Sequence, residues 1–165
     1  MKKLVAVTVA ALTVALLALW LVPASSQPAG RHVTIQLFDS DKTGFSKDIH
    51  EDGQGFGAGD WNVSIDPALD PDSCKHFGTL MAQGTVLKRL GKRNGLFLFH
   101  GVVRLGRGRL VFEWGGRFSE FSKQIEVPVI GGSGAYDGAT GQATASHARR
   151  CGDPGELITI DVSVR

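Results

Sequence analysis

The chain carries an unusual run of small residues, Val129-Ile130-Gly131-Gly132-Ser133-Gly134-Ala135-Tyr136-Asp137-Gly138-Ala139-Thr140-Gly141, with five glycines between Gly131 and Gly141. An alternating apolar segment precedes it, and the β-compatible residues 142–146 follow it. Glycine adopts backbone angles that other residues avoid, which suits a sharp corner or a close approach between strands. The run therefore predicts a corner in a curved sheet.

A glycine-rich loop can also bind a phosphate. Phosphate loops usually end in Gly-Lys-Ser/Thr and lead into a helix whose first amide groups face the anion. No lysine and no helical periodicity follow Gly141. The sequence thus favours the structural corner over the phosphate site.

The rest of the chain is a series of short strand patterns separated by glycine and proline turns. The predicted strands cover residues 33–38, 61–65, 79–90, 96–105, 109–114, 124–130, 142–146 and 157–164. Residues 39–59 are expected to form a long loop with at most a ragged strand, and the two prolines in 66–72 indicate a turn. With no sustained helical periodicity after residue 26, the pattern predicts an all-β barrel or sandwich, and closure would remove exposed strand edges.

The first residues have the organisation of a secretory leader. Lys2 and Lys3 precede an apolar segment, residues 4–22, and Ala24 and Ser26 have the spacing of a signal-peptidase site. We therefore expect a signal peptide over 1–26, one exported domain over 27–165 and no stable membrane insertion after cleavage. The alternative is a membrane anchor formed by residues 4–22, because about 20 apolar residues span a bilayer.

Export changes the charge balance. The chain has 18 Lys and Arg against 16 Asp and Glu, and removal of residues 1–26 deletes two lysines and no acid, which leaves 16 of each sign. A neutral domain gives no support for binding to nucleic acid. The two cysteines, Cys74 and Cys151, are expected to form a disulfide in an exported protein. A metal site is not expected, because His76 is the only histidine near Cys74 and no Cys-x-x-Cys motif occurs.

Two strands supply the candidate ligand-binding residues. Residues 96–105 are largely apolar on both faces, so we expect the lumen to cover one face and a second subunit to be a possible cover for the other. The candidates for contact with a ligand are His100, Phe112 and Trp114.

Three residues are candidates for acid–base chemistry. Asp66, at the mouth of an apolar lumen, would have a raised pKa and act as a general acid, although an Asp before Pro also caps turns. Glu113 is the only acid within residues 110–114, and it would be a solvated outer residue if Leu110 and its neighbours fill the lumen. Tyr136 is the only tyrosine, and its simpler role is packing at the corner.

The segment Ile125-Glu126-Val127-Pro128-Val129-Ile130-Gly131-Gly132-Ser133-Gly134-Ala135-Tyr136 is similar to a known signature, Glu-x-Pro-Val-x-Gly-Gly-Thr-Gly-x-Phe/Tyr. That signature belongs to the dirigent and allene oxide cyclase barrel superfamily, which the chain resembles from about residue 56 onward. The segment Val63-Ser64-Ile65-Asp66-Pro67-Ala68-Leu69 is more weakly similar to the superfamily's Asp-Pro-Leu turn. Thr140 stands where plant dirigent proteins usually carry Arg, so a cation of the cavity is missing.

The resemblance implies a closed eight-stranded antiparallel barrel, often a trimer, whose apolar lumen holds a small hydrophobic molecule. It also implies a protein that steers or catalyses a cyclisation or coupling without a cofactor, either as a cyclase or as a stereo-directing protein. The alternative function is a non-catalytic secreted interaction module whose lumen is filled by side chains.

Overall fold

The computed structural model describes residues 30–50, 57–91, 94–120 and 124–165. The described residues contain no helix long and apolar enough to cross a membrane. Their one helical turn is η1 (Phe118–Glu120), and the expected signal peptide, residues 1–26, lies outside them. The strands are β1 (Arg31–Ser40), β2 (Phe45–Ile49), β3 (Trp61–Leu69), β4 (His76–Gly91), β5 (Asn94–Leu105), β6 (Gly108–Arg117), β7 (Ile125–Gly134), β8 (Thr140–Arg150) and β9 (Asp153–Val164).

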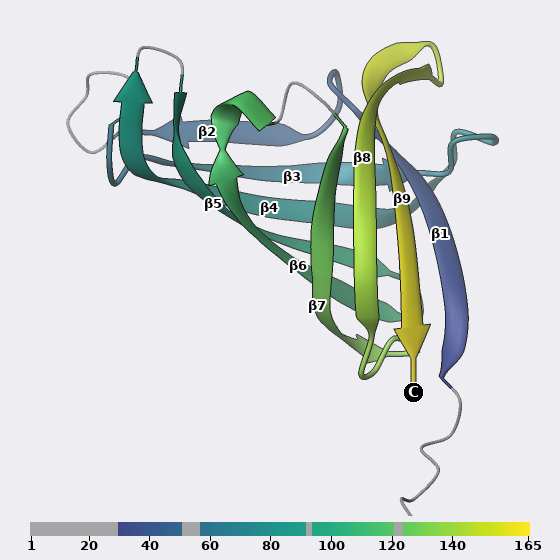
Figure 1. The fold of residues 1–165 in the computed structure, drawn as a ribbon. Coiled ribbons are helices and arrows are strands. Elements are labelled where there is room, and N and C mark those ends of the chain that lie inside the picture. The colour runs from purple at the N-terminus through teal and green to yellow at the C-terminus, as the bar shows by residue number, and fades with distance from the viewer. Residues whose placement is uncertain (1–29, 51–56, 92–93, 121–123) are drawn as a thin grey trace, which may run out of the picture.

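The strands form one antiparallel sheet that closes on itself. Their order is β1-β9-β8-β7-β6-β5-β4-β3-β2, and β1 also pairs with β3 through Phe38 and Leu69 (Figure 1). This pairing closes eight strands into a barrel and leaves β2 as an extra strand on the outer edge of β3. The predicted all-β, closed, eight-stranded barrel is confirmed. Its closing seam, between β1 and β3, has a single registered pair.

The glycine run forms the predicted corner. Strand β7 pairs with β8 through residues 125–129 and with β6 through residues 129–134, so it changes partner at Val129. The register with β6 shifts so that Ile130 is an extra, bulged residue, which bends the strand. A Cβ at Gly132 would fall on the Tyr136 carbonyl oxygen, and Gly134 has φ of +68°. Only glycine fits such positions without displacing the neighbouring backbone.

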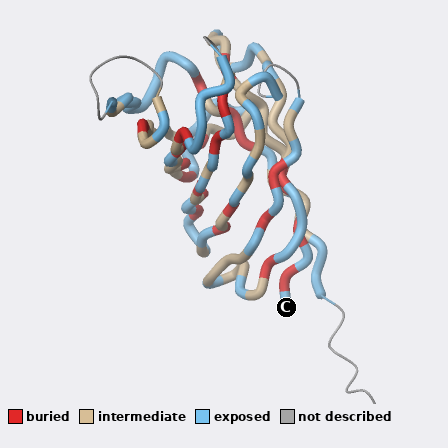
Figure 2. The backbone as a smooth tube through the Cα atoms, turned by 60° about the vertical axis from the view of Figure 1, so that its left-hand side comes forward, coloured by how far each residue is buried: buried red, intermediate tan, exposed pale blue. Residues whose placement is uncertain are grey.

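The core fills the barrel with one face of each strand. Buried and exposed residues alternate along the strands (Figure 2), as expected for a sheet with one face inside. The innermost side chains are Leu37, Val103, Leu110, Ile160 and Val162, all at most 1% exposed. Burial of each such side chain stabilises the fold by about 1.5–3 kcal/mol.

The structure refines two predictions about loops, the turn at 66–72 and the long loop at 39–59. The predicted turn at 66–72 is wrong in its first half, because β3 continues to Leu69 and Pro67 pairs with Thr79 of β4. Proline is tolerated there because the ladder between β2 and β3 ends at Ile65 and the pairing with β1 begins only at Leu69, so no residue is registered with Pro67 on that side. The turn begins at Asp70, whose carboxylate accepts the Ser73 N–H at 2.6 Å. The expected ragged strand within 39–59 is β2.

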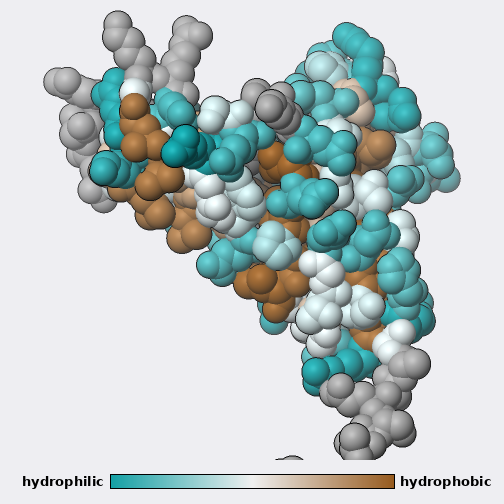
Figure 3. All heavy atoms as spheres, in the orientation of Figure 1, coloured by the Kyte–Doolittle hydropathy of each residue, from teal (hydrophilic) through white to brown (hydrophobic). Residues whose placement is uncertain are grey.

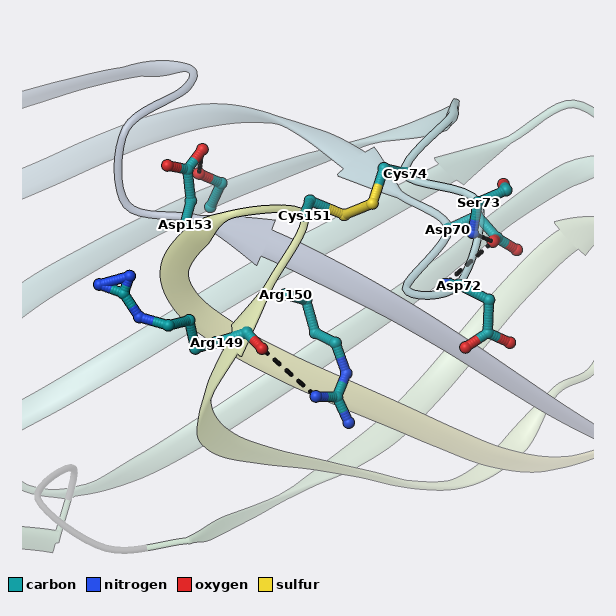
Figure 4. Close-up of a disulfide and its surroundings, with 9 residues drawn as sticks. Asp70, Asp72, Ser73, Cys74, Arg149, Arg150, Cys151 and Asp153 are labelled. Carbon is teal, nitrogen blue, oxygen red and sulfur yellow. Dashed lines mark hydrogen bonds between the residues drawn. A yellow bond between two sulfur atoms is a disulfide. The ribbon is translucent and has the colours of Figure 1, made fainter.

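The predicted disulfide between Cys74 and Cys151 is confirmed. Cys74 lies in the β3–β4 turn and Cys151 in the β8–β9 turn, with Cα atoms 5.5 Å apart (Figure 4). Because β3 and β9 both pair with β1, the disulfide links the two neighbours of β1 across the closing seam. It therefore reinforces the strand pairing of the barrel that has the fewest registered residue pairs.

The second face of β5 is open in the described structure. Leu96 and Leu98 are 37% and 39% exposed, and Leu87 and Leu90 of β4 are also exposed. Hydrophobic groups gather at the left-hand end of the molecule in Figure 3, where these two strands meet. The second subunit expected to cover this face stays a prediction.

Candidate functional site

A cavity of about 160 Å³ lies inside the barrel. Its apolar wall consists of Leu80, Ala82, Phe99, Val103, Phe112, Ile125, Val127, Ala143, Ala145 and Ile158. An apolar cavity of about 150 Å³ holds a benzene-sized molecule. The cavity therefore has room for a ring-sized apolar group, and a larger ligand requires the two phenylalanines of the wall to move.

Two carboxyl groups line the same cavity. Asp39 of β1 and Glu156 of β9 are directly opposite each other in the antiparallel ladder, so their side chains project from the same face of the sheet. Ser64 of β3 adds a hydroxyl to the lining, and Asp66 lies two residues further along β3. The lining is thus apolar over most of its area and carboxylic where β1 and β9 contribute to it.

These acids hold protons more strongly than ordinary carboxyl groups. Burial, together with the nearby charges of Asp66, Glu156 and Asp41, raises the pKa of Asp39 to about 7. Burial also raises the pKa of Glu156, against the opposing charge of His147. Asp66 has a raised pKa for the same reason, although a hydrogen bond from Ser64 lowers it. Near neutral pH the cavity therefore contains a carboxyl group that can either donate or accept a proton.

Asp39 and Glu156 are absent from the sequence-based candidates, yet the sequence contained a signal for both. Asp39 is the next inward position after Val33, Ile35 and Leu37. Glu156 occupies the equivalent position before Ile158 and Ile160. The predicted strands covered residues 33–38 and 157–164, so each of them stopped one residue short of an inward-facing acid.

The structure brings only some of the predicted site residues together. Phe112 lines the cavity. Asp66 does not line it, but its charge acts on Asp39, and it lies beneath the β1–β2 turn, where a Cβ on Gly44 would meet its carboxylate. Trp114 is half-buried against the core and lines a second pocket, which shares Ile125 with the cavity. Phe112 is thus the one predicted site residue that lines the cavity, and its contact with a ligand stays a prediction.

The other three predicted residues lie elsewhere. His100 of β5 and Glu113 of β6 face each other across the ladder and are exposed on the outer surface. Tyr136 lies in the β7–β8 turn, where its ring packs against the core at the glycine corner. None of the three contributes to the lining of the cavity.

Across the described ranges, no three His, Cys, Asp or Glu side chains are grouped so that they could hold a metal ion.

The fold is shared with several proteins that act on small molecules. Pyocyanin demethylase superposes with a TM-score of 0.65 at 16% identity and covers 79% of this chain and all of its own. The Diels Alderase AbmU from Streptomyces koyangensis gives 0.65 at 16% identity over 89% of this chain and 75% of its own. The pterocarpan synthase dirigent protein GePTS1 gives 0.65 at 16% identity over 87% and 98%.

These likenesses establish the architecture, at identities too low to carry an activity across. No protein-family model and no curated protein matches the chain. The predicted resemblance to the dirigent type of barrel is confirmed at the level of the fold.

Proposed function

We propose that this chain is an exported barrel that binds a small apolar molecule in its lumen and steers or catalyses a cyclisation or coupling of that molecule. One observation carries the proposal: an apolar cavity inside the barrel is lined by a pair of facing carboxyl groups, Asp39 and Glu156. Barrels of the same fold include a Diels Alderase and a pterocarpan synthase dirigent protein, which supports this class of chemistry.

The cavity contributes in two ways. Its apolar wall holds one conformer of a flexible substrate, and alignment of the reacting atoms can lower a barrier by several kcal/mol. The carboxyl pair contributes proton transfer: Asp39 donates its proton to a substrate oxygen, and the carboxylate left behind takes a proton back from the cyclised product. This cycle returns the protein to its starting state, so an isomerisation needs no co-reactant.

The alternative function, an interaction module with a filled lumen, is favoured by one observation. The cavity, whose wall includes Phe99 and Phe112, measures about 160 Å³, which is below the roughly 300 Å³ typical of sites for drug-sized ligands. Binding of a ring-sized ligand distinguishes the two functions. Saturable binding supports the proposed function, whereas a lumen filled by side chains would bind no such ligand.

Filling the cavity tests the proposal. Ala145→Phe places a ring in the lumen from β8, and we expect it to weaken binding of small phenols and short fatty acids at least about tenfold, or 1.4 kcal/mol. Native mass spectrometry and titration of the purified protein measure this binding, and analysis of retained ligands detects ring formation.

Ala148→Phe is the matched control, because Ala148 lies on the same strand, three residues away, and faces out of the cavity. Equal binding by both variants, or no binding by the unmodified protein, would contradict the proposed function. Either result would favour the interaction module.

A further inference from the structure

The hairpin between β5 and β6 carries an unusual concentration of positive charge. Arg104, Arg107 and Arg109 fall within six residues, and Arg104 and Arg109 are directly opposite each other in the ladder. Both are exposed on the outer surface. Like charges placed directly opposite across two strands destabilise a sheet. The arrangement therefore has an electrostatic cost that a bound anion would remove.

No acid of the described structure neutralises this pair. The ion pairs found in the described ranges join Lys42 to Asp153 and His50 to Asp60, which are not part of this hairpin. Arg109 is instead held by a neutral partner: its Nε donates to the Ser133 hydroxyl at 3.0 Å. This bond fixes the guanidinium plane and leaves its terminal amino groups for another acceptor.

The two arginines border a shallow groove of about 460 Å³ on the outside of the barrel. Its remaining lining is Met81, Val102, Leu105, Gly106, Gly108 and Ser133. The apolar part of the groove continues across the neighbouring strands. Met81 is registered with Ile65 of β3 and with Val102 of β5, and Val102 is also registered with Val111 of β6. A positively charged row thus lies beside an apolar row on the same face.

We propose that this groove binds an amphiphilic anion, with a phosphate or carboxylate group between Arg104 and Arg109 and an apolar chain on the Met81–Val102 row. Guanidinium groups bind such oxyanions through two parallel hydrogen bonds, which are stronger than bonds between neutral groups. The groove is separate from the lumen, because alternate residues of β5 and β6, including Val103 and Leu110, face inward between the two sites. The inference therefore holds whether or not the lumen binds a ligand.

The test compares binding by the full exported domain and by the double variant Arg104→Gln/Arg109→Gln. The probes are dodecyl phosphate, inorganic phosphate, and phosphatidylcholine vesicles with and without phosphatidylglycerol. We expect the double variant to bind dodecyl phosphate at least about tenfold more weakly, since two charge-assisted contacts are lost. Its free energy of unfolding without ligand should not fall, because a repulsive pair has been removed.

The charge-matched control is Arg89→Gln/Arg117→Gln, which removes two exposed arginines outside the groove. Binding to vesicles only when they contain phosphatidylglycerol identifies a lipid headgroup as the source, and binding of dodecyl phosphate without vesicle binding identifies a free amphiphile. Equal losses in both double variants would overturn the proposal, because the effect would then be one of net charge. Failure of every probe to bind, or dissociation of an oligomer by the groove variant alone, would also overturn it.

Discussion

Replacement of both Cys74 and Cys151 by serine is expected to lower the free energy of unfolding by about 4 kcal/mol. The cysteines are 77 residues apart, and in the chain-entropy model a link of this length removes about that much freedom from the unfolded chain. The link also crosses the seam where β1 meets β3 through one registered pair. Denaturant unfolding measures the loss, with the slope showing whether the unfolded state has expanded.

The reduced wild-type protein is the matched control, because it lacks the link and keeps both side chains. It should be as unstable as the double variant. Each single serine variant should lose about the same amount, since either substitution alone breaks the link. A loss below about 1 kcal/mol in the double variant would show that the seam holds without the disulfide, and that the unfolded chain is already compact.

The sequence predicted the parts of the fold that depend on local backbone chemistry. Glycine spacing marked the corner at Val129–Gly141, because left-handed angles and close backbone approaches are local requirements. Pro67 misled the prediction of a turn, because its effect depends on whether a strand lies on its N–H side. That depends on where β2 stops pairing, which is a long-range property.

The candidate site was less predictable for a similar reason. Alternation shows which residues of a strand share a face, and it does not show which face is inside. From the sequence, either Phe112 or Glu113 could face the interior, depending on which face of β6 is turned inward. In the structure Leu110 and Phe112 are buried, so their face is the inner one. Asp39 and Glu156 are polar residues at strand ends, and their burial follows from the register between β1 and β9.

The acid at the cavity also predicts how stability depends on pH. The pKa of Asp39 is about 7 in the folded protein against 3.8 for the ordinary group, so the folded state binds the extra proton. The folded protein is thus favoured at low pH, and stability falls as pH rises from about 4 to about 7. Asp39→Asn, which stays neutral, should be about 2 kcal/mol more stable than wild type at pH 8 and nearly equal near pH 4. This figure is roughly half of the full linkage value, because Asp39 keeps partial contact with solvent.

Neighbouring groups titrate in the same protein, so the difference between variant and wild type is the quantity to measure. The pKa values of Asp66 and Glu156 shift in the same direction as that of Asp39, whereas those of Asp70 and Asp153 are lowered. Asp48→Asn is the control, because Asp48 is an exposed acid whose charge is not among those that raise the pKa of Asp39. Thermal unfolding of the wild type and of both variants at pH 4, 6 and 8 measures these differences in stability. A stability difference for Asp39→Asn that is constant across these pH values would mean that the carboxyl group is already ionised in the folded protein. Asp39 would then have no proton to donate near neutral pH, and its role in the acid–base part of the proposed function would fail.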